Sequence, residues 1–376
     1  MSDPIYFDNA ATTFPKPPSV VEEIAGCMRE YCGNPGRGSH SLAIAAAEKL
    51  YEAREFASKV FSAKSPENVV FTYNATHALN NAIKAYIPEG SHVLISDMEH
   101  NAVLRPIEEL RRRGVITYDV FSTSGSTECV MRGIRSKIRD NTSAVVSTLA
   151  SNICSRVLPS REIGRFCRSL GLIFIADGAQ AAGHRRISMA DENIDVLCLP
   201  GHKGLFGPQG IGMMITRMGD GGNTVVEGGS GTDSASPYMP EYLPDRFEAG
   251  TANTPGIAGL LAGMRFVCDT GIEQIESVER ELWYRLYSRI SGDRRFILYG
   301  DKRPSAVVLL NKRDRTSAEL GEYLNKHGIC TRSGLHCAPL AHESIGTKDV
   351  GGVRISFSVF NTLKEVDELC DVLYRA

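Results

Sequence analysis

The chain has 376 residues, 42% of them hydrophobic and 23% charged, and a formal net charge of −2. This composition is typical of a soluble globular protein, and the length favours two domains whose cores need no disulfides. The sequence has no basic run and no apolar stretch long enough for a bilayer, so we expect neither nucleic acid nor a membrane as a partner. The first residues do not resemble a signal peptide, and we expect a cytoplasmic protein.

Short apolar runs alternate with amphipathic stretches over the first part of the chain. Strands are predicted at 69–73, 92–97, 115–121, 144–148, 172–177, 194–199 and 211–216. Helices are predicted between most of them, at 75–86, 102–113, 130–138 and 160–170. This alternation predicts an α/β fold with a mostly parallel sheet of seven strands, covered by helices on both faces.

The second part of the chain opens with a Gly- and Ser-rich stretch at 219–236, which predicts a long loop. A smaller α+β domain is predicted after it. Helices are expected at 255–267, 271–291, 316–327 and 362–374, and strands at 296–299, 306–311 and 353–357.

The ten cysteines contain no Cys-x-x-Cys pair. In a chain without a signal peptide we expect them to be free thiols in a reducing compartment, and we expect no metal site. Most of them fit apolar patterns, where cysteine behaves as a small hydrophobic residue. Cys337 differs, because its surroundings are polar.

Two charged residues follow neighbouring predicted strands, at the sheet edge where open α/β folds bind ligands. Asp177 ends the strand 172–177, and Lys203 follows the strand 194–199 between two glycines. Taken singly, the aspartate also fits a helix N-cap and the lysine a basic turn. Together they are the two groups that pyridoxal phosphate chemistry needs, a lysine amine for a Schiff base and a carboxylate that keeps the pyridine nitrogen protonated.

A segment suited to a phosphate lies at 72–77, where a strand is followed by a helix. Helix N-termini bind anions through free N–H groups and the helix dipole, although Asn74 and Thr76 also fit plain capping. His202 offers a further donor. His100 follows the strand 92–97 and is placed to stack on a cofactor or to move protons, with a structural role as the alternative.

Cys337 lies in a predicted loop with Arg332 and His336, whose positive charge would favour a thiolate. An unreactive loop thiol is the alternative. Arg354 lies in the strand 353–357 and is suited to clamp a substrate carboxylate. A surface ion pair is the alternative for this arginine.

A series of short motifs runs along nearly the whole chain. In order they are Tyr6-Phe7-Asp8-Asn9-Ala10-Ala11-Thr12-Thr13, Asn74-Ala75-Thr76, Glu99-His100-Asn101, Ser151-Asn152, Asp177-Gly178-Ala179-Gln180, Gly201-His202-Lys203, Gly250-Thr251 and Arg354. With these motifs the sequence resembles the class V, fold-type I pyridoxal-phosphate enzymes, and within them the cysteine desulfurase and selenocysteine lyase family. The resemblance implies a large cofactor-binding domain over 16–255, and a small α+β domain over 1–15 and 256–376 that carries the cysteine loop.

The resemblance implies the cofactor pyridoxal 5′-phosphate and residues that bind its ring. Lys203 would carry the cofactor as a Schiff base, and Asp177 would pair with the pyridine nitrogen. Gln180 and Asn152 would contact the phenolic oxygen, and His100 would stack on the ring.

The remaining implied roles concern the phosphate and the substrate. Thr76 and His202 would hold the phosphate, with Ala75 beside them, and Thr251 would reach the phosphate of a partner subunit, which implies a homodimer. Arg354 and Asn9 would bind the carboxylate end of the substrate, and Arg332 would line the cysteine loop.

The implied reaction converts L-cysteine to L-alanine, with Lys203 removing the α-proton, His100 managing the thiol proton and Cys337 taking the sulfur as a persulfide for an acceptor protein. Alternatives are a selenocysteine lyase, another class V aminotransferase or lyase, and a binding protein without catalysis.

Two departures from the family pattern bear on the substrate. Pro200 stands where a hydroxyl residue is usual, and Arg156 is expected to add a charge near the substrate pocket.

Overall fold

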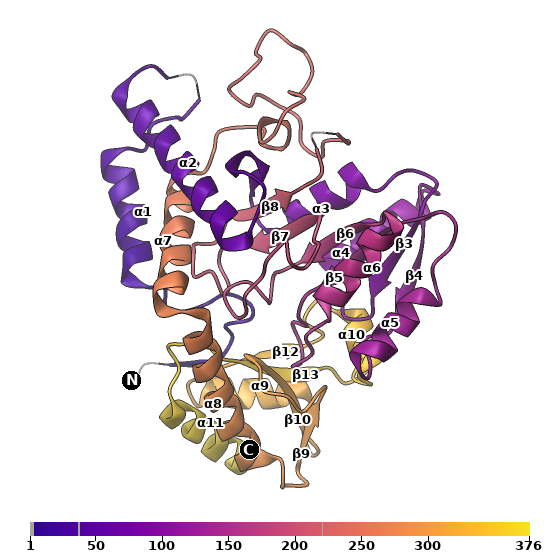
Figure 1. The fold of residues 1–376 in the computed structure, drawn as a ribbon. Coiled ribbons are helices and arrows are strands. Elements are labelled where there is room, and N and C mark those ends of the chain that lie inside the picture. Colours follow the sequence, from indigo (N-terminus) through magenta and orange to yellow (C-terminus); the bar gives the residue numbers. More distant parts are fainter. Residues whose placement is uncertain (1–3, 37, 220) are drawn as a thin grey trace.

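Seven strands form the large sheet, in the order β2-β8-β7-β6-β5-β3-β4 (Figure 1). Their bounds are Val69–Thr72 (β2), His92–Ser96 (β3), Thr117–Phe121 (β4), Thr142–Thr148 (β5), Ile173–Asp177 (β6), Val196–Pro200 (β7) and Gly212–Thr216 (β8). The pairs from β7 to β4 are parallel, and β8 runs antiparallel to both of its neighbours. This computed structural model describes residues 4–36, 38–219 and 221–376, and it confirms the predicted sheet.

Helices lie on both faces of the large sheet. Their bounds are Pro18–Glu30 (α1), Ser41–Phe61 (α2), Ala75–Tyr86 (α3), Asn101–Arg112 (α4), Thr127–Arg135 (α5), Ser160–Leu170 (α6) and Thr254–Thr270 (α7). The four helices predicted between strands are α3 to α6, and α1 and α2 are additional to them. A short 3-10 turn, Pro66–Asn68 (η1), precedes β2.

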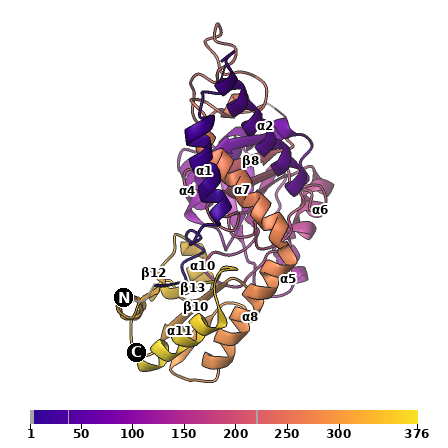
Figure 2. The ribbon, with the colours of Figure 1, turned by 90° about the vertical axis from the view of Figure 1, so that its left-hand side faces the viewer.

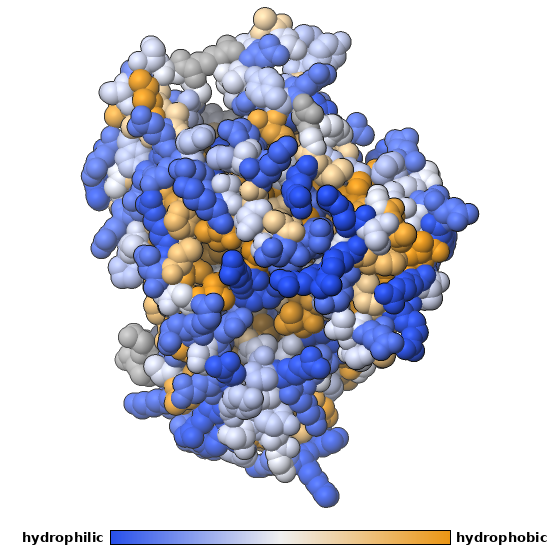
Figure 3. All heavy atoms as spheres, in the orientation of Figure 1, coloured by the Kyte–Doolittle hydropathy of each residue, from blue (hydrophilic) through white to orange (hydrophobic). Residues whose placement is uncertain are grey.

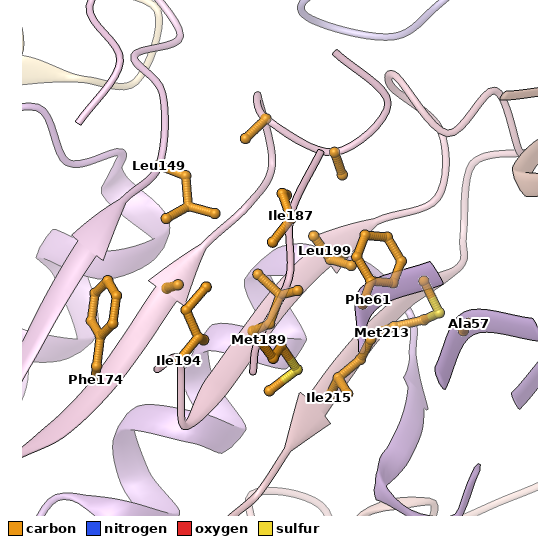
Figure 4. Close-up of a cluster of buried hydrophobic side chains, with 14 of the residues drawn as sticks. Ala57, Phe61, Leu149, Phe174, Ile187, Met189, Ile194, Leu199, Met213 and Ile215 are labelled. Atoms are coloured by element: carbon orange, nitrogen blue, oxygen red, sulfur yellow. The ribbon is translucent and has the colours of Figure 1, made fainter. Parts of the chain in front are cut away.

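The core of this large part lies on the two faces of the sheet, because successive strand residues point in opposite directions. Val145 belongs to one apolar cluster and Val146 to the other. Figure 4 shows part of the first cluster, to which β6, β7 and β8 contribute Phe174, Leu199 and Met213. The strands β3 and β7 are buried along their whole length, as expected for a sheet covered on both sides.

A second, antiparallel sheet has the order β12-β13-β10-β9 and forms the lower part of the molecule in Figures 1 and 2. The bounds here are Ile272–Ile290 (α8), Phe296–Tyr299 (β9), Val307–Lys312 (β10), Ser317–Lys326 (α9), Arg332–Gly334 (β12), Pro339–Ser344 (α10), Gly352–Ser356 (β13) and Leu363–Arg375 (α11). Strand Ile5–Tyr6 (β1) pairs in parallel with Ile329–Cys330 (β11), which brings the N-terminal segment to this sheet. The predicted α+β part is confirmed.

The connection between the two parts runs through α7 and α8. Helix α7 packs against α1 and α2, and its residues Leu260 and Met264 join the core of the large sheet. Helix α7 thus packs with the large sheet. The predicted domain boundary between residues 255 and 256 stays a prediction. The segment 221–236 has no helix or strand, as predicted, and a single 3-10 turn, Asp245–Phe247 (η2), follows it before α7.

The surface is mostly hydrophilic on the face shown in Figure 3, where apolar side chains form smaller patches. Across the described residues, no helix combines the length and the apolar character needed to cross a membrane.

Candidate active site

The carboxyl ends of β2, β3, β5, β6 and β7 lie at one edge of the large sheet, because these strands run in the same direction. A cavity of about 230 Å³ lies at this edge. Its lining includes eight of the residues that the sequence singles out for a cofactor, namely Ala75, Thr76, His100, Asn152, Asp177, Gln180, His202 and Lys203. The topology thus brings together residues from the carboxyl ends of five strands.

Lys203 and Asp177 line the wall of this cavity. Asp177 ends β6 and is buried, and its Oδ1 accepts the N–H of Ala179 at 2.9 Å. Burial lowers the pKa of the Lys203 amine to about 8, against the opposite effect of the Asp177 carboxylate. Burial raises the pKa of Asp177, and the nearby Lys203 lowers it in part. An amine with such a pKa is partly neutral near neutral pH, the form that attacks an aldehyde or removes a proton.

One end of the cavity is formed by the start of α3. Asn74 caps this helix by accepting the N–H of His77 at 2.9 Å, and Ala75 and Thr76 form the first turn. The helix start sits directly against β8, since a Cβ on Gly212 would lie only 2.8 Å from the carbonyl carbon of Asn74. The first N–H groups of a helix have no partner within it and attract anions.

His202 lies at the same cavity. Its Nδ1 is buried and has no hydrogen-bond partner among the described residues. Burial, and then the charge of Lys203, lower the pKa of His202 to about 4, so the ring is neutral at neutral pH. Its backbone carbonyl accepts from Lys16 Nζ at 2.8 Å, which fixes the turn that carries Lys203.

His100 is the N-cap of α4. Its Nδ1 accepts the N–H of Ala102 at 3.0 Å, and burial lowers the pKa of His100 to about 4. The neutral ring therefore carries its proton on Nε2, which is the nitrogen not used by the cap. This leaves one nitrogen of His100 for chemistry in the cavity.

The Cys337 loop reaches this edge of the sheet from the small domain. Cys337 is exposed. Its carbonyl accepts the N–H of Asn101 at 2.7 Å, next to His100. The carbonyl of His336 accepts from Asn152 Nδ2 at 2.8 Å. Because Asn152 and His100 line the cavity, these bonds place the cysteine loop beside it.

Arg354 and Arg332 share one carboxylate, that of Asp8. Arg354 Nη2 donates to Asp8 Oδ1 at 3.0 Å, and Arg332 Nη2 donates to Asp8 Oδ2 at 2.8 Å. Arg354 also donates to the carbonyl of Asn152 at 3.0 Å, and its buried Nε has no partner among the described residues. Burial lowers the pKa of Arg354, and Asp8 counteracts this effect. A carboxylate clamp at Arg354 stays a prediction, with the guanidinium already held at two points.

Two other predicted ligands are engaged with the backbone. Asn9 is buried, and its Nδ2 donates to the carbonyl of Ser356 at 3.0 Å. Gln180 lines the cavity, but its Nε2 donates to the carbonyl of Ala10 at 2.9 Å. Their roles toward the substrate and the cofactor stay predictions.

Arg156 corrects an expectation from the sequence. It does not add an open charge to the substrate pocket, because its Nη2 donates to Asp301 Oδ1 at 3.0 Å and its Nη1 to Thr123 at 3.2 Å. This ion pair joins the loop after β5 to the small domain. Pro200 ends β7 and lines the cavity, as its sequence position implies.

Thr251 lies apart from the cavity of Lys203. It lines a separate and larger cavity of about 490 Å³, together with Arg54, Tyr73 and His77. Within one subunit it is therefore not assembled with the other predicted cofactor ligands, and its role across an interface stays a prediction.

Several residues near the site have no role in the sequence-based account. Asp8 binds two arginines, and its motif alone could have drawn attention to it. Glu99 is fully buried, accepts from Ser96 and from the Thr148 N–H, and has a pKa raised to about 8 by burial. His342 lies behind the cysteine loop in α10, where the sequence gives no signal.

Comparison with known proteins places the chain in a family. Residues 5–369 match the aminotransferase class-V family. A probable cysteine desulfurase of Methanothermobacter thermautotrophicus is 32% identical over 99% of this chain and 94% of its own length. A cysteine desulfurase of Yersinia pestis is 29% identical over 99% of this chain and 93% of its own length.

Solved structures give the same result for the fold. The apo structure of a cysteine desulfurase from Thermococcus onnurineus has a TM-score of 0.90 at 30% identity, and the match covers 99% of this chain and 94% of that one. A cysteine desulfurase of Escherichia coli has a TM-score of 0.87 at 24% identity, with 99% and 94% covered, and supports the fold alone. The chain therefore belongs to the aminotransferase class-V family, whose enzymes use pyridoxal phosphate.

Proposed function

We propose that this protein is a pyridoxal-phosphate-dependent cysteine desulfurase, which converts L-cysteine to L-alanine and takes the sulfur as a persulfide on Cys337. The observation that carries the proposal is that the Cys337 loop lies beside the cavity that Lys203 lines. The cavity with Lys203 and Asp177 lies beside the Cys337 loop, which is bonded to Asn101 and Asn152 at the cavity edge.

The residues of the cavity fit pyridoxal phosphate. The start of α3 offers free N–H groups, and the buried Nδ1 of His202 is a polar atom without a partner among the described residues, so both suit a phosphate. The buried Asp177 suits a protonated pyridine nitrogen, and Lys203, with its lowered pKa, suits an aldehyde. When bound, the cofactor withdraws electrons from the α-carbon of an amino acid and makes its α-proton acidic.

The protein's own side chains carry out the proton transfers and the attack on sulfur. The neutral Lys203 amine removes the α-proton, and the Nε2–H of His100, which can only donate while Nδ1 caps α4, offers a proton to the cavity. The Cys337 thiolate forms a bond to the substrate sulfur, while the bond between that sulfur and the β-carbon breaks. The electron pair stays on the β-carbon, which takes up a proton, and the α-carbon regains a proton from Lys203 to give alanine. General acid and base help of this kind contributes roughly 10²–10⁴-fold to a rate.

The test measures alanine and sulfide from L-cysteine in the presence of a thiol reductant. Cys337→Ser and Lys203→Ala should each abolish both products, whereas Cys32→Ser, at another exposed cysteine, should leave them unchanged. A Cys337→Ser enzyme with the parent rate would contradict the proposal. Activity of the parent with selenocysteine and none with cysteine would contradict it as well.

A homodimer is part of the proposal. Apolar side chains are exposed on α1, on α2 and in the segment between β8 and η2, among them Met28, Ile44, Tyr51 and Tyr238. Such residues favour an interface with a second copy. In that dimer Thr251 would reach the phosphate in the other subunit. Light scattering should give twice the chain mass, and Thr251→Ala should weaken cofactor binding; a monomer that binds the cofactor equally well would refute this part.

An acceptor protein for the sulfur completes the proposal. Cys337 is exposed, so a second protein can reach a persulfide there. Incubation of the persulfide form with a small thiol acceptor should move the sulfur from Cys337, which mass spectrometry detects. Sulfur that stays on Cys337 would contradict an open transfer route.

A further inference from the structure

A chain of hydrogen bonds leads from the cysteine loop into the buried interior of the small domain. His336, the residue before Cys337, has its Nδ1 3.2 Å from His342 Nε2. His342 Nδ1 lies 2.7 Å from Thr347 Oγ1. His342 and Thr347 are fully buried, and the two imidazole rings are stacked with centroids 5.4 Å apart.

The donor and the acceptor of each hydrogen bond can be assigned by starting from the carbonyl of Arg332, which ends the series. His336 Nε2 lies 3.1 Å from the carbonyl of Arg332, which can only accept, so this nitrogen carries the proton. Nδ1 of a neutral His336 must then accept from His342 Nε2. His342 Nδ1 in turn accepts from the hydroxyl of Thr347. Every ring nitrogen is thereby used, and burial lowers the pKa of both His336 and His342, which keeps the rings neutral.

The backbone at this point needs such support. His336 and Cys337 have φ values of +50° and +56°, a left-handed conformation that side chains other than glycine rarely adopt. Two successive residues of this kind persist only where the surroundings fix them. The carbonyls of both residues are bonded to the large domain, and the His336 ring supplies the third point of attachment.

The base of this chain is itself anchored. His342 belongs to α10, and Ala341 of this helix and its N-cap residue Ala338 pack against Met98 of the large domain. Ser344, at the end of α10, donates to Asp97 at 2.7 Å. The series of hydrogen bonds therefore connects the cysteine loop to α10, which is held against the large domain.

We propose that His342 and Thr347 are positioning residues that act through the His336 ring to hold Cys337 in its reactive place. The inference rests on the proposed function of Cys337 as the sulfur acceptor. It also implies that the thiol proton does not go to His336, whose single free electron pair is taken by His342.

The test uses Thr347→Val, which keeps the shape and removes the hydroxyl, and Thr347→Ser, which keeps it. A matched control exists on the large sheet, where His92 Nδ1 lies 2.9 Å from Thr142 Oγ1 and His92 is fully buried. Thr142→Val therefore removes the same kind of contact away from the cysteine loop. His342→Leu and His342→Gln add a second pair, in which Gln keeps a donor.

Two experiments are carried out on each full-length holoenzyme. Hydrogen–deuterium exchange of the peptide around Cys337 reports the order of the loop without any turnover, and steady-state alanine formation gives kcat and KM. Thr347→Val should speed exchange in this peptide and lower kcat by about tenfold to a hundredfold, the cost of a misplaced reacting group. KM for cysteine should stay within about twofold, because the loop acts after the substrate binds. Thr347→Ser should restore both the parent exchange rate of this peptide and the parent kcat.

The outcomes separate this inference from the proposed function. If Cys337→Ser keeps the parent activity, the proposed function has failed, whatever the Thr347 variants do. If Cys337→Ser is inactive while Thr347→Val matches Thr142→Val in loop exchange and kcat, the positioning role is refuted. If His342→Leu fails to fold, the Thr347 pair alone decides.

Discussion

The carboxylate of Asp8 holds two arginines in place, and its removal gives the sharpest test of how the small domain is assembled. Asp8 is 8% exposed and Arg354 3% exposed, and together with Arg332 they form an ion triad between the N-terminal segment and the strands β12 and β13. Asp8→Asn keeps the size of the side chain but removes its charge. The Arg354 guanidinium then stays buried with little to compensate it.

The expected cost follows from this burial. Breaking a buried ion pair by removing one partner costs roughly 3–5 kcal/mol. An entropy of unfolding of about 2.1 cal/mol/K per residue, over 376 residues, gives about 0.8 kcal/mol for each degree of melting temperature. Asp8→Asn should therefore lower Tm by roughly 4–6 °C, measured by differential scanning calorimetry.

The chain contains a matched control for this variant. Asp367 also binds two arginines, with Arg285 Nε at 2.7 Å and Arg289 Nη1 at 2.9 Å, but it lies on the surface of α11. Exposed pairs contribute little to stability, so Asp367→Asn should lower Tm far less than Asp8→Asn. Equal shifts in the two variants would show that burial of Arg354 is not what makes Asp8 important.

Three further predictions concern groups near the site. Glu99 has a pKa raised to about 8 from 4.5, so between these values the folded state holds a proton that the unfolded state has lost, and stability falls as pH rises; urea titrations should show this fall in the parent and not in Glu99→Gln. The rate at which cofactor-free protein combines with pyridoxal phosphate should rise with pH through about 8, as neutral Lys203 forms; absorbance measures it, and a flat profile would contradict the lowered pKa. Arg156→Met and Asp301→Asn should each destabilise by about 1–3 kcal/mol, and the double variant by less than their sum; additive losses in urea would refute the coupling.

Much of the fold could be predicted because its signals are local. The apolar runs of β3, β6 and β7 are short and uninterrupted, which is the pattern of strands buried on both faces. Lys203 and Asp177 could be found for the same reason, since Asp177 ends such a run and Lys203 lies in the turn after another. The sheet order then brings their loops together, as the rule for open α/β sheets predicts.

Other parts of the site could not be predicted, because they depend on contacts between distant segments. Asp8 and Arg354 meet across the whole chain, and no local pattern shows that pairing. The charge of Arg156 is visible in the sequence, but the pairing with Asp301 is not, so the sequence suggested a charge near the substrate pocket where the structure has an ion pair. His342 lies in a short helix, and only its contact with His336 gives it a role.

The central claim is that Cys337 receives the sulfur of L-cysteine. Its most direct test is mass spectrometry of the intact holoenzyme and of its peptides after brief exposure to L-cysteine without reductant. We expect one added sulfur atom on the peptide that contains Cys337, and none on it in Lys203→Ala. Alanine formed by the parent enzyme with no sulfur on that peptide, or with the sulfur on another cysteine, would contradict it.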